Sequence, residues 1–129
     1  MGEKTILIVE DDIGTLHLLQ QIIQRAGYQP LFAQGGAEAL ALLRQSAVDL
    51  VLLDIMLRDM DGWAVLKSIR GDLHLTHIPI FIVTGRLPSE HRSQMQVLKD
   101  LYDDYFLKPF EVGQLVERIG AALNSRVAA

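Results

Sequence analysis

The chain has 129 residues, of which 50% are hydrophobic and 22% are charged, which is ordinary for one globular domain and excludes a disordered or collagen-like chain. Twelve Lys and Arg residues against sixteen Asp and Glu residues give a net charge of −4, which disfavours non-specific binding of nucleic acid. Cysteine is absent, no apolar run is long enough for a membrane span and no secretory leader pattern is present, so we expect a single soluble, cytoplasmic domain over residues 1–129.

The first part of the chain alternates between short apolar runs and helical periodicity. Thr5–Val9 is apolar and β-branched, which predicts a buried strand, and apolar residues at helical spacing predict a helix over Ile13–Ala26. Gln29–Ala33 is a weaker strand, and its Pro30 places it at a sheet edge because proline cannot donate to the hydrogen-bond ladder. A helix rich in Ala and Leu is predicted over Ala37–Arg44.

The second part repeats this alternation. The continuous apolar run Leu50–Leu53 predicts another buried strand, and a helix over Trp63–Ile69 follows it. Ile78–Val83 predicts a third strong strand, which is followed by a more polar helix over Pro88–Lys99 and a short strand over Tyr105–Leu107. The last segment carries a helical stripe of apolar residues, namely Val112, Leu115, Val116, Ile119, Ala122 and Leu123.

Five strands and five helices in strict alternation predict an α/β fold with a parallel sheet covered by helices on both faces. Polar residues follow every predicted strand except the second: Glu10, Asp11 and Asp12, then Asp54, Thr84 and Lys108. The carboxyl ends of parallel strands meet at one edge, and ligands bind there where the strand order reverses. We therefore expect a doubly wound, flavodoxin-like, five-stranded sheet of order 2-1-3-4-5, with Asp11 beside Asp54.

The clustered carboxylates predict a cation site. Acidic groups packed together repel one another, so either one takes a proton or a cation neutralises them. Oxygen-only ligands favour a hard cation such as Mg²⁺, for which Mn²⁺ could substitute. A metal beside a carboxylate nucleophile and a lysine is typical of phosphoryl transfer, with Lys108 pairing with phosphate charge and the Thr84 hydroxyl bonding a phosphate oxygen.

Four motifs occur in order along the chain: ILIVEDD at 6–12, LLDIMLRDMDG at 52–62, IVTG at 82–85 and YFLKPF at 105–110. Together they resemble the receiver domain of two-component response regulators, and the resemblance spans nearly the whole chain. It implies a phosphoacceptor switch, which receives a phosphoryl group from a histidine kinase or phosphotransfer protein. It also implies that a downstream protein reads the face made by the fourth helix, the fifth strand and the fifth helix.

The resemblance implies the phosphoacceptor and its metal ligands. Asp54 matches the phosphoacceptor aspartate of the family. The implied Mg²⁺ ligands are the carboxylates of Asp11 and Asp54, the backbone carbonyl of Met56, and Glu10 through a water molecule. Self-catalysed phosphorylation and dephosphorylation are the only reactions implied, so we do not expect an enzyme that turns over a substrate.

The resemblance also implies the residues that respond to phosphorylation. Thr84 matches the switch hydroxyl, and Lys108 matches the phosphate-pairing lysine, whose bond to Pro109 is usually cis in this family. Tyr105 matches the switch aromatic residue, which moves between exposed and buried positions. A tyrosine in a strand that simply packs against the sheet is the competing interpretation.

The chain departs from the family pattern at three places. Arg58 stands where proline is most common after the phosphoacceptor, and Leu101-Tyr102 replaces the usual Gly-Ala before the last strand. The stretch between Thr84 and Lys108 is also slightly longer than usual. These departures bear on the geometry of the fourth helix and of the loop that follows it.

Three other functions fit the sequence less well. A receiver-fold interaction module that is not phosphorylated usually loses a site residue, and none is lost here. An aspartate-nucleophile phosphatase needs a second Asp two residues after the nucleophile, where this chain has Met56. A flavin- or nucleotide-binding domain needs a Gly- or Ser/Thr-rich phosphate loop after the first strand, where this chain has three acidic residues.

Several polar or aromatic residues have structural roles as their simplest interpretation. Asp12 is favoured as the N-cap of the first helix, and Trp63 as a packing residue. His74 and His77 have the spacing of a metal pair, but nothing in the sequence supplies further zinc ligands, so we expect no zinc site.

The sequence leaves the output of the domain open. After Leu123 only residues 124–129 follow, so we expect no DNA-binding helix-turn-helix in this chain, which is either a stand-alone receiver acting through a partner or a piece of a larger protein. We expect no direct contact with nucleic acid or membrane. The downstream partner is unknown, and dimerisation through the fourth- and fifth-helix face is compatible with the pattern.

Overall fold

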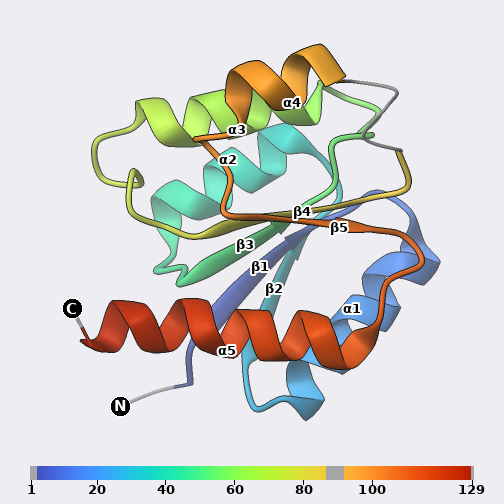
Figure 1. Cartoon of the computed structure of the whole chain (residues 1–129), viewed down its shortest axis with the longest axis vertical. Helices are drawn as coiled ribbons and strands as arrows, with labels where there is room; N and C mark the ends of the chain where they lie inside the picture. Colours follow the sequence, from blue (N-terminus) through green and yellow to red (C-terminus); the bar gives the residue numbers. More distant parts are fainter. Residues whose placement is uncertain (1–2, 87–91, 129) are drawn as a thin grey trace.

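The computed structural model of the chain describes residues 3–86 and 92–128. Within these residues, five strands and five helices alternate along the chain (Figure 1). The strands are β1 (Thr5–Val9), β2 (Gln29–Ala33), β3 (Leu50–Leu53), β4 (Ile80–Thr84) and β5 (Asp104–Leu107). The helices are α1 (Ile13–Arg25), α2 (Gly36–Gln45), α3 (Gly62–Gly71), α4 (Arg92–Leu98) and α5 (Val112–Ala128).

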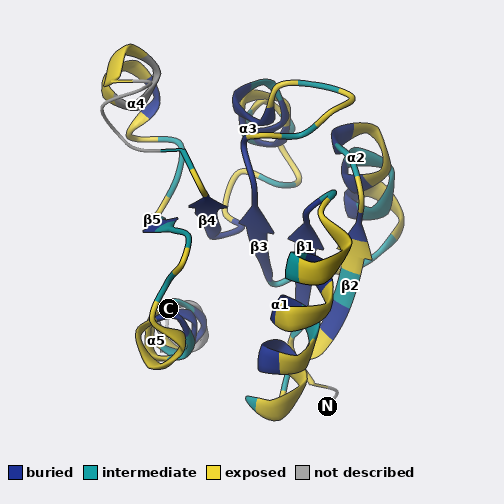
Figure 2. Cartoon of the chain, turned by 90° about the vertical axis from the view of Figure 1, so that its right-hand side faces the viewer, coloured by how far each residue is buried: buried dark blue, intermediate teal, exposed yellow. Residues whose placement is uncertain are grey.

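The strands form one parallel sheet in the order β2-β1-β3-β4-β5, which confirms the predicted topology. Figure 2 looks along the sheet and shows α1 and α5 on one face and α2, α3 and α4 on the other. The order reverses between β1 and β3, where Val9 pairs with Leu53. In folds of this kind ligands bind at such a reversal, so the ends of these two strands are the expected position of a site.

Side chains alternate between two cores, one on each face of the sheet. Ile6 and Ile8 pack with α1 and α5, whereas Leu7 and Val9 pack with α2, α3 and α4. This alternation follows from the two-residue period of a strand. Burying an aliphatic side chain of this size stabilises the fold by about 1.5–3 kcal/mol. Continuous apolar strands are thus required, because both faces of the sheet are covered.

Two aspartates fix the starts of helices that flank the carboxyl edge of the sheet. Asp12 is the N-cap of α1, and its Oδ2 accepts hydrogen bonds from the Thr15 backbone N–H at 2.9 Å and from the Thr15 hydroxyl at 2.7 Å. Asp61 caps α3 by accepting from the Trp63 N–H at 3.1 Å. The capping role predicted for Asp12 is confirmed, as is the packing role of Trp63, which is only 3% exposed.

Some element boundaries differ from the sequence prediction. The run Ile78–Val83 was predicted to be a strand, but β4 begins at Ile80 and continues to Thr84. Pro79 explains the late start, because proline has no N–H for the ladder. The predicted helix over Pro88–Lys99 is described as α4 from Arg92, and residues 87–91 lie outside the described residues.

The apolar stripe of α5 is narrower than its sequence pattern indicates. Leu115, Ile119 and Leu123 are buried, but Val112 at the start of the helix is 45% exposed. A helix that packs on one face of a sheet buries about one stripe, and Val112 lies at the margin of that stripe.

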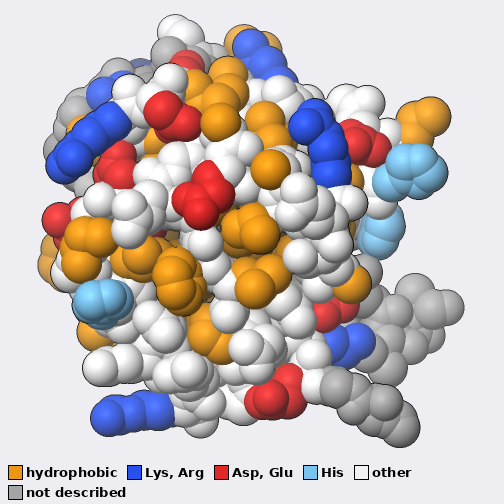
Figure 3. Space-filling view, turned by 180° about the vertical axis from the view of Figure 1, so that it is seen from behind, with side chains coloured by type: hydrophobic (Ala, Val, Ile, Leu, Met, Phe, Trp, Pro, Cys, Tyr) orange, Lys and Arg blue, Asp and Glu red, His pale blue; other side chains and the backbone are white. Residues whose placement is uncertain are grey.

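The face of the molecule shown in Figure 3 mixes acidic, basic and hydrophobic side chains. Among the described residues on this face, no continuous basic patch of the kind that binds a nucleic-acid backbone is visible. Over the described part of the chain, every helix is too short or too polar to cross a membrane.

Gly62 allows the start of α3 to pack directly on the segment that follows β3. A Cβ atom at position 62 would lie 2.2 Å from the Cα atom of Ile55 and 2.8 Å from the carbonyl oxygen of Asp54. The Gly62 N–H also donates to the Ile55 carbonyl at 3.1 Å. Because the obstructing atoms belong to the backbone, any larger residue must displace the chain next to Asp54.

We expect Gly62→Ala to lower the free energy of unfolding by about 1–3 kcal/mol, because overpacking against backbone forces the chain to shift. Gly71→Ala is the matched control, since a Cβ there meets no atom within 4 Å and the residue ends the same helix. Urea denaturation of both variants checks this. Equal stability of the two variants would contradict the close approach at Gly62.

Candidate functional site

Three charged residues at the carboxyl edge of the sheet are fixed by backbone hydrogen bonds. Glu10, Asp54 and Lys108 each come directly after a strand. Their N–H groups donate to the last carbonyl groups of β2, β1 and β4, at 3.0, 3.0 and 2.8 Å respectively. The ladder therefore continues one residue beyond each strand, and the positions of the three side chains follow from the register of the sheet.

Successive side chains along a strand point to opposite faces of the sheet, and this determines which of the site residues lie on the same side. Counted along their strands, Glu10, Asp54 and Lys108 continue the positions that face α1 and α5. Thr84 and Tyr105 occupy the opposite positions, which face α3 and α4. Thr84 and Tyr105 therefore take the other side of the strand alternation, although Thr84, the last residue of β4, lies at the same edge of the sheet as the charged cluster.

Lys108 bridges the two carboxylates of the cluster. Its Nζ donates to Oδ2 of Asp54 at 2.9 Å and also to Oε1 of Glu10. Glu10 and Asp54 are only 2% and 5% exposed, and a buried carboxylate is very costly unless it is paired. One ammonium group serves two carboxylates, so negative charge is left in excess at this site.

Burial and pairing act in opposite directions on the pKa values in this cluster. Burial raises the pKa of the Glu10 carboxyl, and the hydrogen bond from Lys108 offsets this only in part. Burial alone would lower the pKa of Lys108, but its hydrogen bonds to Glu10 and Asp54 outweigh burial and raise it. Lys108 is therefore held as a cation, which is the form needed to pair with an anionic group.

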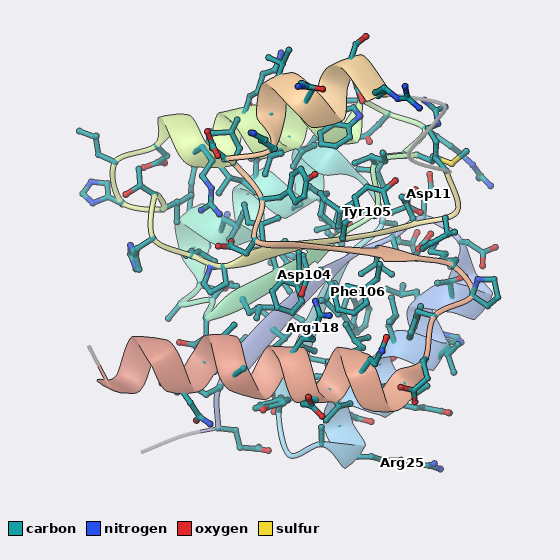
Figure 4. The ribbon with its side chains drawn as sticks, viewed as in Figure 1. Asp11, Arg25, Asp104, Tyr105, Phe106 and Arg118 are labelled. Atoms are coloured by element: carbon teal, nitrogen blue, oxygen red, sulfur yellow. The ribbon has the colours of Figure 1, made fainter. Side chains whose placement is uncertain are left out.

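The backbone that follows β3 donates hydrogen bonds to two of the acidic side chains. The Met56 N–H donates to Oδ1 of Asp54, and the Arg58 N–H donates to Oδ2 of Asp11, both at 2.9 Å. Asp11 lies at the carboxyl edge of the sheet (Figure 4). The Arg58 side chain is 87% exposed and its Nε lies 3.9 Å from Oδ2 of Asp11, so this ion pair contributes little to stability.

The donor set at this edge fits Mg²⁺ by its chemistry. The side chains of Asp11, Asp54 and Glu10 offer only oxygen atoms, and Mg²⁺ typically binds one or two carboxylates and keeps several water molecules. The expected ligands in direct contact are Asp11, Asp54 and the Met56 carbonyl, which include two carboxylates. Groups of three or more His, Cys, Asp or Glu side chains placed to hold a metal do not occur in the described residues.

Thr84 and Tyr105 both contact the backbone of Arg86. The buried Thr84 hydroxyl oxygen accepts from the Arg86 N–H at a long 3.4 Å, and the Tyr105 hydroxyl donates to the Arg86 carbonyl at 2.7 Å. The strand ends bring Glu10, Asp11, Asp54, Thr84 and Lys108 to one edge of the sheet, whereas the hydroxyls of Thr84 and Tyr105 contact Arg86. The peptide bond between Lys108 and Pro109 is cis, as the resemblance implies.

Asp59 has a structural role that the sequence analysis missed. Its Oδ1 accepts from the Gly36 N–H at 2.9 Å and its Oδ2 accepts from the Ala37 N–H at 3.1 Å. These bonds lower the pKa of Asp59 and cap α2, whose own N-cap residue, Gly35, has no side chain to do so. The sequence before α2 has no Ser, Thr, Asp or Asn at the N-cap position, which indicates that another residue supplies the cap. It does not indicate which distant residue this is.

A sequence model of the response regulator receiver domain matches residues 6–120 of the chain. The transcriptional regulatory protein ZraR of Salmonella typhimurium is 37% identical over 122 residues, which are 95% of this chain but 27% of ZraR. The polar-differentiation response regulator DivK of Brucella ovis is 32% identical over 121 residues, covering 94% of this chain and 97% of DivK. The chain therefore spans about a quarter of the first relative and nearly all of the second.

Solved structures agree with these matches. A CheY-like response regulator receiver domain from Methanospirillum hungatei superimposes with a TM-score of 0.88 at 30% identity, covering 98% of both chains. A putative response regulator from Chloroflexus aurantiacus gives a TM-score of 0.83 at 29% identity, covering 96% of this chain and 99% of that chain.

We expect Lys108→Met to lower the free energy of unfolding by about 1–3 kcal/mol at neutral pH without added metal, because two buried carboxylates lose the ammonium that they share. Adding Glu10→Gln to this variant should recover part of the loss, since one buried charge is then removed. Chemical denaturation measures both effects, with the exposed Lys67→Met as control. A Lys108→Met variant no less stable than the control would contradict the bridging role.

The cap from Asp59 predicts a defined pH dependence. A carboxyl whose pKa is lowered by folding contributes stability that is complete above its ordinary value of 3.8 and is lost as the pH falls through the folded-state pKa. Asp59→Ala should therefore be less stable than the parent at neutral pH, and the difference should shrink in acid. Urea midpoints across this range measure it, with the exposed Asp100→Ala as control. A difference independent of pH would argue against the ionised cap.

Proposed function

Because the chain belongs to the response regulator receiver domain family, we propose that it is the phosphoacceptor switch of a two-component phosphorelay and that Asp54 accepts the phosphoryl group. The observation that carries this proposal is the bridge from Lys108 to Asp54 and Glu10 at the carboxyl edge of the sheet. A lysine held as a cation beside a buried aspartate provides the charge that a phosphorylated aspartate needs.

The donor is a phosphohistidine of a sensor kinase or of a phosphotransfer protein. An oxygen of Asp54 attacks phosphorus, the new O–P bond forms, and the P–N bond breaks with its electron pair left on the imidazole nitrogen. Lys108 remains protonated and pairs with the oxygens of the transferred group. The carboxylates of Asp11 and Asp54 and the Met56 carbonyl would hold Mg²⁺, or Mn²⁺ in its place, and the metal would supply positive charge that favours the transfer.

The geometry around Arg86 supports the way in which the switch is read. The hydroxyls of Thr84 and Tyr105 contact the N–H and the carbonyl of the same residue. When Thr84 turns toward a phosphoryl oxygen, it gives up its long bond to the Arg86 N–H, and the segment that positions Tyr105 is released. A charge change at Asp54 then biases the α4, β5 and α5 face, which a downstream protein reads.

The second candidate is an interaction module of the same fold that is never phosphorylated. The complete set of Asp11, Asp54, Thr84 and Lys108 argues against it, because a module without this chemistry has no use for a buried pair of carboxylates. Met56 argues against a phosphatase, as it leaves the general-acid position empty. We propose a cytoplasmic signalling domain that is not a turnover enzyme.

Incubation with acetyl phosphate and Mg²⁺, followed by intact-mass spectrometry, tests the phosphoacceptor role. We expect the gain of one phosphoryl group that is acid-stable and base-labile, because an acyl phosphate forms at Asp54. Chelation of the metal should abolish the gain, as should Asp54→Asn, whose amide is not a nucleophile. Asp49→Asn is the matched control, because it removes a carboxylate at the opposite end of β3. This variant should still be phosphorylated.

A short lifetime of the phosphoryl group is separated from failure to react by binding of beryllofluoride, which mimics the phosphorylated state. Absence of both the mass gain and beryllofluoride binding would overturn the phosphoacceptor proposal in favour of the interaction module.

A further inference from the structure

A row of three aromatic rings connects α3 to β5 on the face of the sheet opposite the charged cluster. The ring centroids of Trp63 and Tyr102 are 6.0 Å apart, and those of Tyr102 and Tyr105 are 6.1 Å apart. The interplanar angles are 52° and 59°, and tilted pairs at this separation attract each other beyond simple burial. Tyr102 is the middle ring, so the row depends on it.

Each end of the row touches a segment with an assigned role in the switch. At one end, Trp63 follows Gly62, whose N–H bonds the carbonyl of Ile55 directly after Asp54. At the other end, the Tyr105 hydroxyl bonds the Arg86 carbonyl, and Arg86 N–H contacts Thr84. Figure 4 shows Tyr105 on the side of β5 away from α5, whereas Asp104 and Phe106 lie toward that helix.

Both neighbours of Tyr102 are held by the side chain of Arg70, which is 14% exposed. Arg70 at the end of α3 donates from Nε to the Leu101 carbonyl at 2.7 Å and from Nη2 to Oδ2 of Asp103 at 3.0 Å. The same Asp103 oxygen accepts from the Ile80 N–H at 2.8 Å, which ties the loop to β4. These bonds hold the loop that carries Tyr102, whose ring packs against the ring of Tyr105. Burial raises the pKa of the Tyr102 hydroxyl.

We propose that Tyr102 is a positioning residue for the Tyr105 switch, holding the Tyr105 ring where its hydroxyl reaches Arg86 and linking that position to Trp63 at the start of α3. This inference rests on the proposed function, because it concerns the response to phosphorylation of Asp54. Its consequence is a second route from the phosphoacceptor to Tyr105, through α3 and the loop before β5, besides the route through Thr84.

Trp63 is the only tryptophan of the chain, so its emission reports on this row. Emission is recorded before and after addition of Mg²⁺ and acetyl phosphate, each protein against its own baseline, while intact mass gives the phosphorylated fraction. The variants are Tyr102→Phe, which keeps the ring, and Tyr102→Leu, which keeps apolar bulk without it. Tyr28→Leu is the matched control, because Tyr28 packs on the α1 and α5 face.

We expect the parent, Tyr102→Phe and Tyr28→Leu to change their emission to similar extents per phosphorylated molecule. For Tyr102→Leu the emission change should be at most about one third of that in the parent. The loss of an ordinary aromatic pair shifts the equilibrium constant between two states by about this factor. Thermal unfolding confirms that each variant is folded. If Tyr102→Leu does not fold, Tyr102→Met and Tyr102→Phe form the comparison.

Each outcome bears on the proposal. Phosphorylation of Asp54 with equal emission changes in all variants, or with no change in the parent, overturns the role of Tyr102 and leaves the phosphoacceptor function intact. Failure of Asp54 to gain a phosphoryl group overturns both. A selective loss in Tyr102→Leu that Tyr102→Phe does not show supports the positioning role, because a general loss of stability would not depend on the ring.

Discussion

The constraint on which this structure depends is the burial of two carboxylates beside a single ammonium. Glu10 and Asp54 lie almost out of contact with solvent, and Lys108 contacts both. An arrangement of this kind is stabilised only while the lysine stays charged and in place. With one lysine for two carboxylates, the site is suited to the cation and the phosphoryl group of the proposed switch. The stability of the fold and the proposed response thus depend on the same set of charges.

The parallel sheet makes this arrangement possible with little help from the loops. The residue that directly follows each of three strands lies at one edge of the sheet. A backbone hydrogen bond to the neighbouring strand holds each of these residues in place. This is why the sequence sufficed for the strand order and for the clustering of Glu10, Asp54 and Lys108. The apolar runs determine the register of the strands, and the acidic or basic residue after each run determines which side chains meet at the carboxyl edge.

Other features could not be read from the sequence, because they depend on contacts between distant segments. The cap that Asp59 gives to α2 joins residues more than twenty positions apart. The late start of β4 follows from Pro79, which a simple apolar pattern treats as part of the run. The departure at Leu101-Tyr102 was visible, but its meaning came from Arg70, which holds that loop, and from the rings on either side.

In the proposed switch, the alternation of side chains along the strands determines how a change at Asp54 would reach Tyr105. Asp54 and Lys108 continue the strand positions that face α1 and α5, whereas Thr84 and Tyr105 occupy positions that face α3 and α4. Because Asp54 and Tyr105 take opposite sides of this alternation, the proposed switch relies on the segments that lie between them. Two segments are placed to do so: the residues after β4, through Arg86, and the start of α3, which packs on the backbone of Asp54 and Ile55. Tyr105 contacts the first segment directly and the second through Tyr102, so in the proposed switch its position depends on both segments.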